Sequence, residues 1–304
     1  MGRVKPFFTK EVKRDMQYVY IAMSDRLVLF PHNRTSTMVW DMEDGRSLGL
    51  LEENTSSIST ASLNSLKNTA VTVTDLDDAN QVYPVKIWSL ETMQCTANLT
   101  ATNPVARLLN DRILLGSEDG PIKVWDIGGS NPAALMDLEG HSDAIWSIDA
   151  SDTSNAALSG SFDKSVRLWD LRTGQCVRIM EGHSHWVTSV SMDSACKTAV
   201  SGSRDEKVKL WDLGSGRCIE TYDHGQIVYD VMMHESGCSF LASGFDGNLK
   251  AWAFGTDKPL FDADLNSIGP NGMRFAASRD LSLVATCYNN ATRDVGGVSV
   301  WRYG

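Results

Sequence analysis

Three residue types that together can hydrolyse a substrate, His, Ser and Asp, recur at fixed spacing in the middle of this 304-residue chain. Two sets lie at matched positions, forty-two residues apart: His141, Ser159 and Asp163, and then His183, Ser201 and Asp205. A Ser that gives its proton to a His oriented by an Asp is the arrangement of a nucleophilic triad. Repetition of the whole set in a neighbouring segment favours a structural role, because an active site is needed only once.

Two other motifs of catalysis, a Gly-rich phosphate loop and the HExxH metal motif, do not occur in the sequence. The six cysteines are scattered without a CxxC pair, as is typical of thiols in a reducing compartment rather than of a zinc site or a disulfide framework. We therefore expect no catalytic residue, no bound cofactor and no metal.

The segments that would position these residues are internal repeats. The stretch SGSFDKSVRLWDL at 159–171 returns as SGSRDEKVKLWDL at 201–213, and the pattern apolar, Lys/Arg, apolar, Trp occurs five times with two looser copies. The tryptophans are separated by 48, 37, 44, 42, 41 and 49 residues and lie at Trp40, Trp88, Trp125, Trp169, Trp211, Trp252 and Trp301. Seven units of about forty residues are typical of propeller blades.

Each unit reads as four short strands, because β-branched stretches alternate with Gly, Asp and Ser turns. Along residues 166–169 the side chains point alternately to two faces, and both faces carry bulk, so the sheet should be packed on both sides. In four units an Asp stands six residues before the Trp, where its carboxylate can bind turn amides: Asp119, Asp163, Asp205 and Asp246.

On these residues the chain resembles the WD-repeat (WD40) family, and the resemblance covers nearly its whole length. The family's elements stand as GH at 140–141 and 182–183, SGS at 159–161 and 201–203, the turn Asp, and WD at four of the tryptophans. The resemblance implies that His, Ser, Asp and Trp form a buried hydrogen-bonded chain in two repeats. The members would be His141, Ser159, Asp163 and Trp169, and His183, Ser201, Asp205 and Trp211.

The predicted fold is all-β: residues 1–304 form one seven-bladed propeller with four antiparallel strands in each blade. Only three residues follow Trp301, so the last blade lacks an outer strand of its own. We predict that residues 4–10 supply this strand and close the ring, because an open edge would be a template for aggregation.

The predicted binding surface uses side chains that the scaffold does not explain. In WD-repeat propellers the loops from strand four to the next strand one, and from strand two to strand three, share a face that often binds partners. Aromatic residues and Arg are favoured at such interfaces. On this face, over blades 4–6, we expect a peptide or helix to contact Glu118, Trp146, Phe162, Trp186, Arg204 and Phe245. Expanded turns at 74–84 and 288–297 would form a wall opposite, with Asp75, Asp77 and Asp78 steering basic partners.

Two alternatives to an interaction scaffold stay open. The WDLR stretch at 169–172 resembles the WDxR motif by which some WD-repeat proteins act as substrate receptors of cullin-type ubiquitin ligases, and Arg172 would then contact the adaptor. The other alternative is a propeller hydrolase, which would need carboxylates or metal ligands converging on the propeller axis.

Composition narrows the partners further. The formal charge of −10 argues against a protein that wraps nucleic acid, because such binding neutralises phosphates with Lys and Arg. No apolar run reaches the length of a membrane helix, and the N-terminus has no apolar signal segment. We expect an intracellular, most simply cytoplasmic, protein that binds other proteins as part of a larger complex.

Overall fold

All regular elements that the structure describes are β-strands. This computed structural model describes residues 8–13, 20–24, 26–54, 56–77, 81–103, 105–129, 131–245, 247–264, 274–278, 280–281, 283–290 and 295–302. The chain divides into two compact units: a terminal unit of residues 1–100 and 266–304, and a central unit of residues 101–265.

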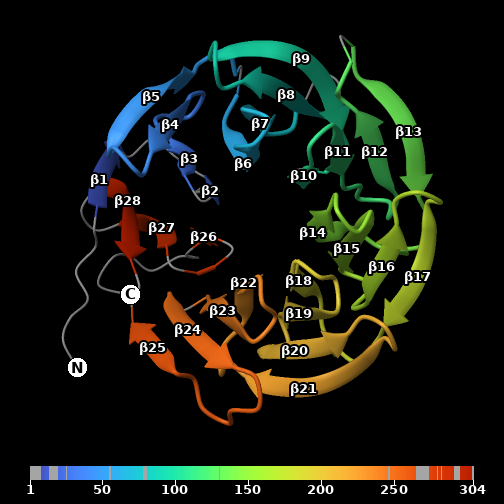
Figure 1. Ribbon diagram of the computed structural model, residues 1–304. Helices are drawn as coiled ribbons and strands as arrows, with labels where there is room; N and C mark the ends of the chain where they lie inside the picture. The colour runs from blue at the N-terminus through green and yellow to red at the C-terminus, as the bar shows by residue number, and fades with distance from the viewer. Residues whose placement is uncertain are drawn as a thin grey trace. The chain divides into compact units, whose positions relative to one another are not determined.

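The central unit contains four antiparallel sheets of four strands, which we call blades 3 to 6 (Figure 1). Blade 3 consists of β10 (Ala106–Leu108), β11 (Arg112–Leu115), β12 (Ile122–Asp126) and β13 (Ala133–Leu138). Blade 4 consists of β14 (Ile145–Ser151), β15 (Ala156–Ser161), β16 (Val166–Asp170) and β17 (Gln175–Met180). Blade 5 consists of β18 (Val187–Met192), β19 (Thr198–Ser203), β20 (Lys207–Asp212) and β21 (Arg217–Asp223). Blade 6 consists of β22 (Val228–Met233), β23 (Ser239–Gly244), β24 (Asn248–Ala253) and β25 (Phe261–Asp264).

The terminal unit contains three further four-stranded sheets among its described residues, blades 1, 2 and 7. Blade 1 consists of β2 (Ala22–Met23), β3 (Leu27–Pro31), β4 (Thr37–Asp41) and β5 (Arg46–Leu51). Blade 2 consists of β6 (Ile58–Asn64), β7 (Thr69–Thr74), β8 (Tyr83–Ser89) and β9 (Gln94–Ala101). Blade 7 has the strand order β1 (Phe8–Lys13), β28 (Val295–Arg302), β27 (Leu283–Asn290) and β26 (Arg274–Ala277).

The outer strand of blade 7 comes from the N-terminal end of the chain. Strand β1 pairs antiparallel with β28, with Phe8 opposite Val300 and Lys13 opposite Val295. The paired strand therefore ends three residues later than the predicted range of 4–10, and residues 4–7 lie outside the described residues. The pairing runs further because β27 and β28 are themselves eight residues long.

Those long strands also change the interpretation of residues 288–297. The whole stretch was expected to be an expanded turn, but residues 288–290 continue β27 and residues 295–297 begin β28, so the paired hairpin is longer than predicted. In blade 2 the expanded turn at 74–84 is narrowed by a bridge between Asp77 and Val82. Asp78 lies outside the described residues.

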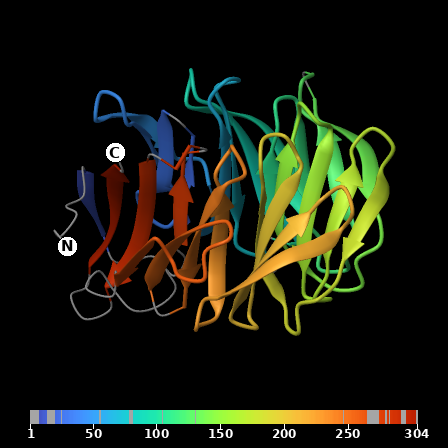
Figure 2. The same ribbon diagram turned by 60° about the horizontal axis from the view of Figure 1, so that its bottom comes forward.

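The turn after the Trp-bearing third strand explains the recurring Trp-Asp and the Gly four residues after the Asp. In blade 4 the Gly174 amide donates to the Asp170 carbonyl over 2.8 Å, and Gly216 bonds Asp212 in the same way in blade 5. Both glycines have φ of +73°, a left-handed conformation that Gly adopts without steric cost. The chain thus reverses within four residues, and Figure 2 shows such turns joining the strands of the central blades.

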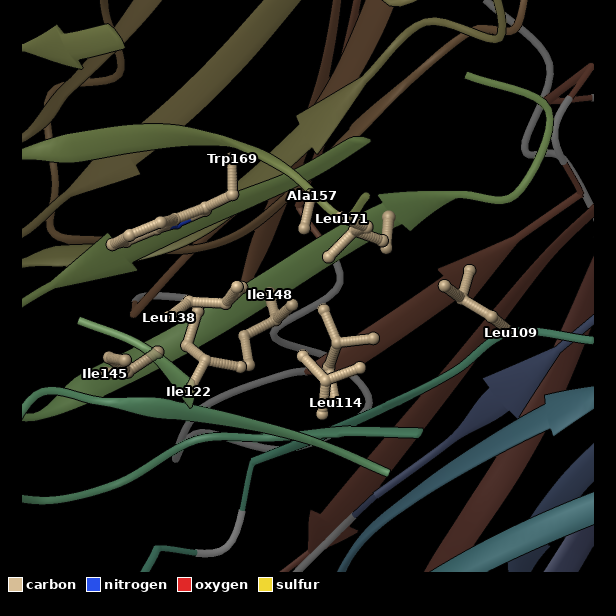
Figure 3. Packing of buried hydrophobic residues seen from close by; sticks show 11 residues of the cluster. Leu109, Leu114, Ile122, Leu138, Ile145, Ile148, Ala157, Trp169 and Leu171 are labelled. Carbon is tan, nitrogen blue, oxygen red and sulfur yellow. The ribbon is translucent and has the colours of Figure 1, made fainter. Parts of the chain in front are cut away.

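The core of the central unit lies between its blades. One cluster joins Leu114 and Ile122 of blade 3 to Ile145, Ile148 and Trp169 of blade 4 (Figure 3). Equivalent clusters join blade 4 to blade 5 around Trp211, and blade 5 to blade 6 around Trp252. These three tryptophans are each at most 1% exposed, and blades 4 and 5 are packed on both faces, as the sequence predicts for a blade.

Candidate functional site

A buried hydrogen-bonded chain runs through blade 4. His141 lies in the loop before β14, Ser159 on β15 and Trp169 on β16. The imidazole Nε2 is 2.7 Å from Ser159 Oγ, and Trp169 Nε1 donates to the same Oγ over 2.8 Å. The other imidazole nitrogen, Nδ1, is 2.7 Å from the carboxylate of Asp163 in the β15–β16 turn. The four residues named from the sequence therefore form one hydrogen-bonded network.

Blade 5 repeats this arrangement. His183 contacts Ser201 Oγ at 2.7 Å through Nε2 and the Asp205 carboxylate at 2.8 Å through Nδ1. Trp211 Nε1 donates to Ser201 Oγ over 2.8 Å. Each Asp also accepts turn amides, as the Asp carboxylate was expected to do: Asp205 accepts from the amides of Ser184 and Lys207.

Burial and hydrogen bonding shift the pKa values of these groups. Burial is the largest single influence and would raise the pKa of Asp163 and of Asp205, but the hydrogen bond and charge of the paired imidazole, together with hydrogen bonds from neighbouring residues, outweigh it. The pKa of Asp163 is well below its ordinary value, and that of Asp205 falls from 3.8 to about 2. Burial lowers the pKa of His141 more than Asp163 raises it, which favours the neutral imidazole.

A third chain, in blade 2, was missed in the sequence. Trp88 Nε1 donates to Thr72 Oγ1 over 2.9 Å, and Thr72 Oγ1 donates to Asn54 Oδ1 over 3.0 Å. Thr72 and Asn54 are both buried and take the places of Ser and His. Ala70 pairs with Trp88, and Thr72 follows two residues later. This spacing was the signal by which the hydroxyl partner of Trp88 could have been found in the sequence.

Two blades carry an apolar residue in the place of the Ser. Leu115 takes it in blade 3, where Trp125 Nε1 is buried with no hydrogen-bond partner among the described residues. Ala242 takes it in blade 6, as the sequence indicates. The turn Asp of that blade, Asp246, lies outside the described residues.

These chains are scaffold elements rather than active sites. Ser159 and Ser201 are fully buried, and each hydroxyl already bonds an imidazole and an indole, so no substrate carbonyl can approach it. The described ranges, searched for three or more clustered His, Cys, Asp or Glu side chains, hold no group arranged to bind a metal ion.

A second set of side chains forms a partly exposed aromatic stack that spans blades 4 and 5. Phe162 lies between two tryptophans, with its ring centroid 4.9 Å from Trp146 and 4.0 Å from Trp186 and with interplanar angles of 23° and 14°. The guanidinium of Arg204 lies over the other face of Trp186, 5.0 Å from the ring centroid. We call these four residues the aromatic stack.

Loop backbone bonds and a bulge position the stack. The Phe162 amide donates to the Ala144 carbonyl over 2.9 Å, and the Arg204 amide donates to the Trp186 carbonyl over 3.0 Å. These bonds hold each turn between strands two and three against the loop before strand one of the same blade. Trp146 sits at a register shift between Ile145 and Ser147, and a bulge of this kind redirects a strand side chain.

The other two residues predicted for this surface make no ring-stacking or cation–π contact with the four residues of the stack. Phe245, 51% exposed, stacks on Tyr229 of its own blade at 6.0 Å. Tyr229 was missed in the sequence, although it occupies the same bulge position as Trp146. Glu118 is exposed in the β11–β12 turn of blade 3 and makes no ring or ion contact among the described residues.

Arg172 lies in the turn after β16. Its side chain is 72% exposed, and its guanidinium contacts the Asp170 carboxylate at 3.2 and 3.3 Å. These hydrogen bonds raise the pKa of Arg172 and lower that of Asp170. The cation is therefore held at the surface by the Asp of its own WDLR motif.

Blades with a buried Trp on the third strand and a turn Asp between strands two and three define a β-propeller repeat protein. Residues 133–170, 174–212 and 216–253 match the family described as WD domain, G-beta repeat. Over these three segments the chain consists of WD40 repeats. Each matched segment begins at the outer strand of one blade and ends on the third strand of the next.

Several proteins of known name are similar to parts of this chain. The CCR4-associated factor 4 homolog of Candida glabrata is 35% identical over 113 residues, which is 33% of this chain and 19% of that protein. The human WD repeat-containing protein 3 is 33% identical over 28% of this chain and 9% of its own length. Eukaryotic translation initiation factor 3 subunit I of Aspergillus niger is 33% identical over 23% and 20%. The matches thus span a fifth or less of these relatives.

In the part of the chain that the structure describes, no helix has the length and apolar character needed to cross a membrane.

Proposed function

We propose that this protein is a non-catalytic interaction platform that binds other proteins through the loops of blades 4 to 6. The aromatic stack supports the proposal most directly. Burying the indole of Trp146, 38% exposed, together with an exposed guanidinium, matches the composition of interface hot spots. WD40-repeat proteins usually lack catalysis, and the relative named a subunit of an initiation factor shows that such chains can belong to complexes.

The proposal predicts that removal of one aromatic ring lowers the affinity for partner proteins. Among the described residues, Phe162 is the one ring that contacts both tryptophans, so Phe162→Ala removes the contact that fixes the positions of Trp146 and Trp186. We expect affinity for captured partners to fall at least tenfold, the size typical of hot-spot residues. The measurement is quantitative mass spectrometry of proteins retained by the tagged variant and by wild type at equal amounts of folded protein.

Two further variants make that measurement selective. Val177→Ala removes an apolar side chain that is 42% exposed on the outer strand β17, away from the aromatic stack, and should keep the same partners. Arg172→Ala tests the alternative function, a ubiquitin-ligase substrate receptor, because it removes the exposed guanidinium of WDLR. Unchanged capture by Phe162→Ala would refute the platform, and loss of ligase components from Arg172→Ala alone would favour the receptor.

We also infer that residues 1–304 form one seven-bladed propeller that β1 closes. Seven four-stranded sheets and the pairing of β1 with β28 support this inference. Deleting residues 1–13 should leave the N–H and C=O groups of β28 unpaired, and such an edge recruits other strands.

The deletion is therefore expected to make the protein associate with itself in a concentration-dependent way. Size-exclusion chromatography with light scattering over a hundredfold dilution range measures this. A deletion of residues 1–6, which ends before β1, is the matched control and should behave as wild type. A monomeric 14–304 chain with unchanged thermal stability would contradict the inference.

A further inference from the structure

The aromatic stack has two unlike ends. At the blade 5 end, Trp186 carries Phe162 on one face and the Arg204 guanidinium on the other. At the blade 4 end, Trp146 carries Phe162 on one face, and no second ring or cation lies on it among the described residues. Because a cation already lies over one end of the stack, the geometry suits a second cation at the open end.

Comparison of neighbouring blades shows why this end is open. Phe162 and Glu118 occupy the same turn position, each directly before the turn Asp of its blade. Trp186 and Ala144 also correspond, because their carbonyls accept the amides of Arg204 and Phe162. At the junction of blades 4 and 5 two rings fill the space, whereas at the junction of blades 3 and 4 the corresponding residues are a carboxylate and a methyl group.

The blade 3 turn is held close to Trp146. The Ile145 amide, one residue before Trp146, donates to the carbonyl of Ser117 over 3.1 Å, and Ser117 directly precedes Glu118. Trp146 and Glu118 are thus each one residue away from a backbone hydrogen bond that joins blade 4 to blade 3.

The exposed charged side chains also differ between the two ends of the aromatic stack. Near Trp146 the exposed side chains are acidic: Glu118, Asp119 and Asp143. Toward blade 5 the exposed charges are mixed: Lys164 in the Phe162 turn, Arg204, and Glu206 two residues after Arg204. A basic group would therefore be attracted more strongly to the Trp146 end.

We propose that the free face of Trp146, with the carboxylate of Glu118 beside it, is a pocket for one Arg or Lys side chain of a partner peptide. The guanidinium or ammonium group stacks on the indole and pairs with Glu118, which orients the peptide across blades 3 to 5. This assignment rests on the proposed use of the aromatic stack as a docking surface, and it specifies the chemistry of the partner.

The test uses two immobilised pools of nine-residue peptides with randomised flanks, one with Arg at the centre and one with citrulline. Citrulline keeps the shape of Arg and removes its charge. Wild-type protein should bind the Arg pool about tenfold more tightly, since the cation–π contact and the ion pair are both lost with citrulline. Equal binding of the two pools, or no detectable binding of the Arg pool, would overturn the assignment.

Three variants test which residue causes the preference for Arg over citrulline. Glu118→Gln should reduce it severalfold, and Glu118→Lys should reverse it toward a pool with Glu at the centre. Glu235→Gln changes the net charge by the same amount in an exposed turn of blade 6 and should leave the preference intact. Glu118 is exposed and makes no ion pair with another described residue, so these changes should not unfold the protein, which thermal denaturation checks. A preference that survives Glu118→Gln would place the cation elsewhere and refute the pocket.

The outcome also separates this pocket from the platform itself. If Phe162→Ala loses its partners but Arg and citrulline pools bind alike, the platform stands and the cation pocket is wrong. If Phe162→Ala keeps all partners, the platform fails, and the pocket fails with it.

Discussion

Changing Ser201 to Ala should lower the free energy of unfolding by about 3 kcal/mol. The Oγ atom is the shared partner of His183 Nε2 and Trp211 Nε1, and both rings are buried. Its removal leaves two polar groups without a partner in a site that is closed to water. Each such group costs about 1–3 kcal/mol, more than a hydrogen bond contributes when it is intact. Equilibrium unfolding in urea measures the difference.

Blade 2 supplies the matched control for this change. It uses Thr72 at the corresponding position, so Ser201→Thr keeps a hydroxyl for both rings and should cost much less than Ala. Ser215→Ala, in the exposed turn before β21, controls for loss of a serine that bonds only its own turn. Equal stabilities of the Ala and Thr variants would mean that the hydrogen bonds of Ser201 contribute nothing to the free energy of unfolding beyond side-chain packing.

Stability should fall as the pH falls, in two stages. The pKa of His141 lies below 6.5 in the folded protein, and those of Asp163 and Asp205 lie below 3.8. The unfolded chain therefore binds these protons more readily, and unfolding takes up protons. The loss should begin below pH 6.5 through His141 and steepen between pH 3.8 and about 2 through Asp205.

The Asp205 carboxylate can be isolated in that profile. Each His–Asp pair should contribute about 1 kcal/mol after solvent screening is allowed for. Asp205→Asn should flatten the dependence below pH 3.8, whereas Asp257→Asn, which alters an exposed carboxylate, should leave the slope unchanged. Asp75 acts in the opposite direction because burial raises its pKa. Its contribution is the same in wild type and in Asp205→Asn, so it cancels when the two pH slopes are compared. Identical slopes would contradict the role of Asp205.

The central blades could be predicted because their signals are local. Trp169, Asp163 and Ser159 lie within eleven residues, and one turn and two adjacent strands bring them together whatever surrounds the blade. Blade 2 keeps the geometry with Asn54 and Thr72, and a search for His and Ser does not detect these replacements.

Two other features could not be found by local reading. At Tyr229 and Trp146 a bulge inserts one residue into the strand, so the regular alternation of side chains between the two faces of the sheet is interrupted. A pattern with a period of two therefore assigns these two side chains to the wrong face of the sheet. The bounds of β1 depend on pairing with β28, nearly three hundred residues away, and no short-range pattern determines where such a strand starts. Stack partners such as Phe162 and Trp186 belong to different blades, so only their residue types were visible in the sequence.

The antiparallel pairing of β1 with β28 determines how blade 7 responds to mechanical force. Phe8 lies opposite Val300, so the chain enters β1 and leaves β28 at the same end of the sheet. A pull applied before Phe8 and after Arg302 would load the first pair alone and then each next pair in turn. Strands that part in this way unzip at low force, whereas strands pulled along their length must break all their hydrogen bonds together. If this protein tethers partners under tension, blade 7 is where it would yield first.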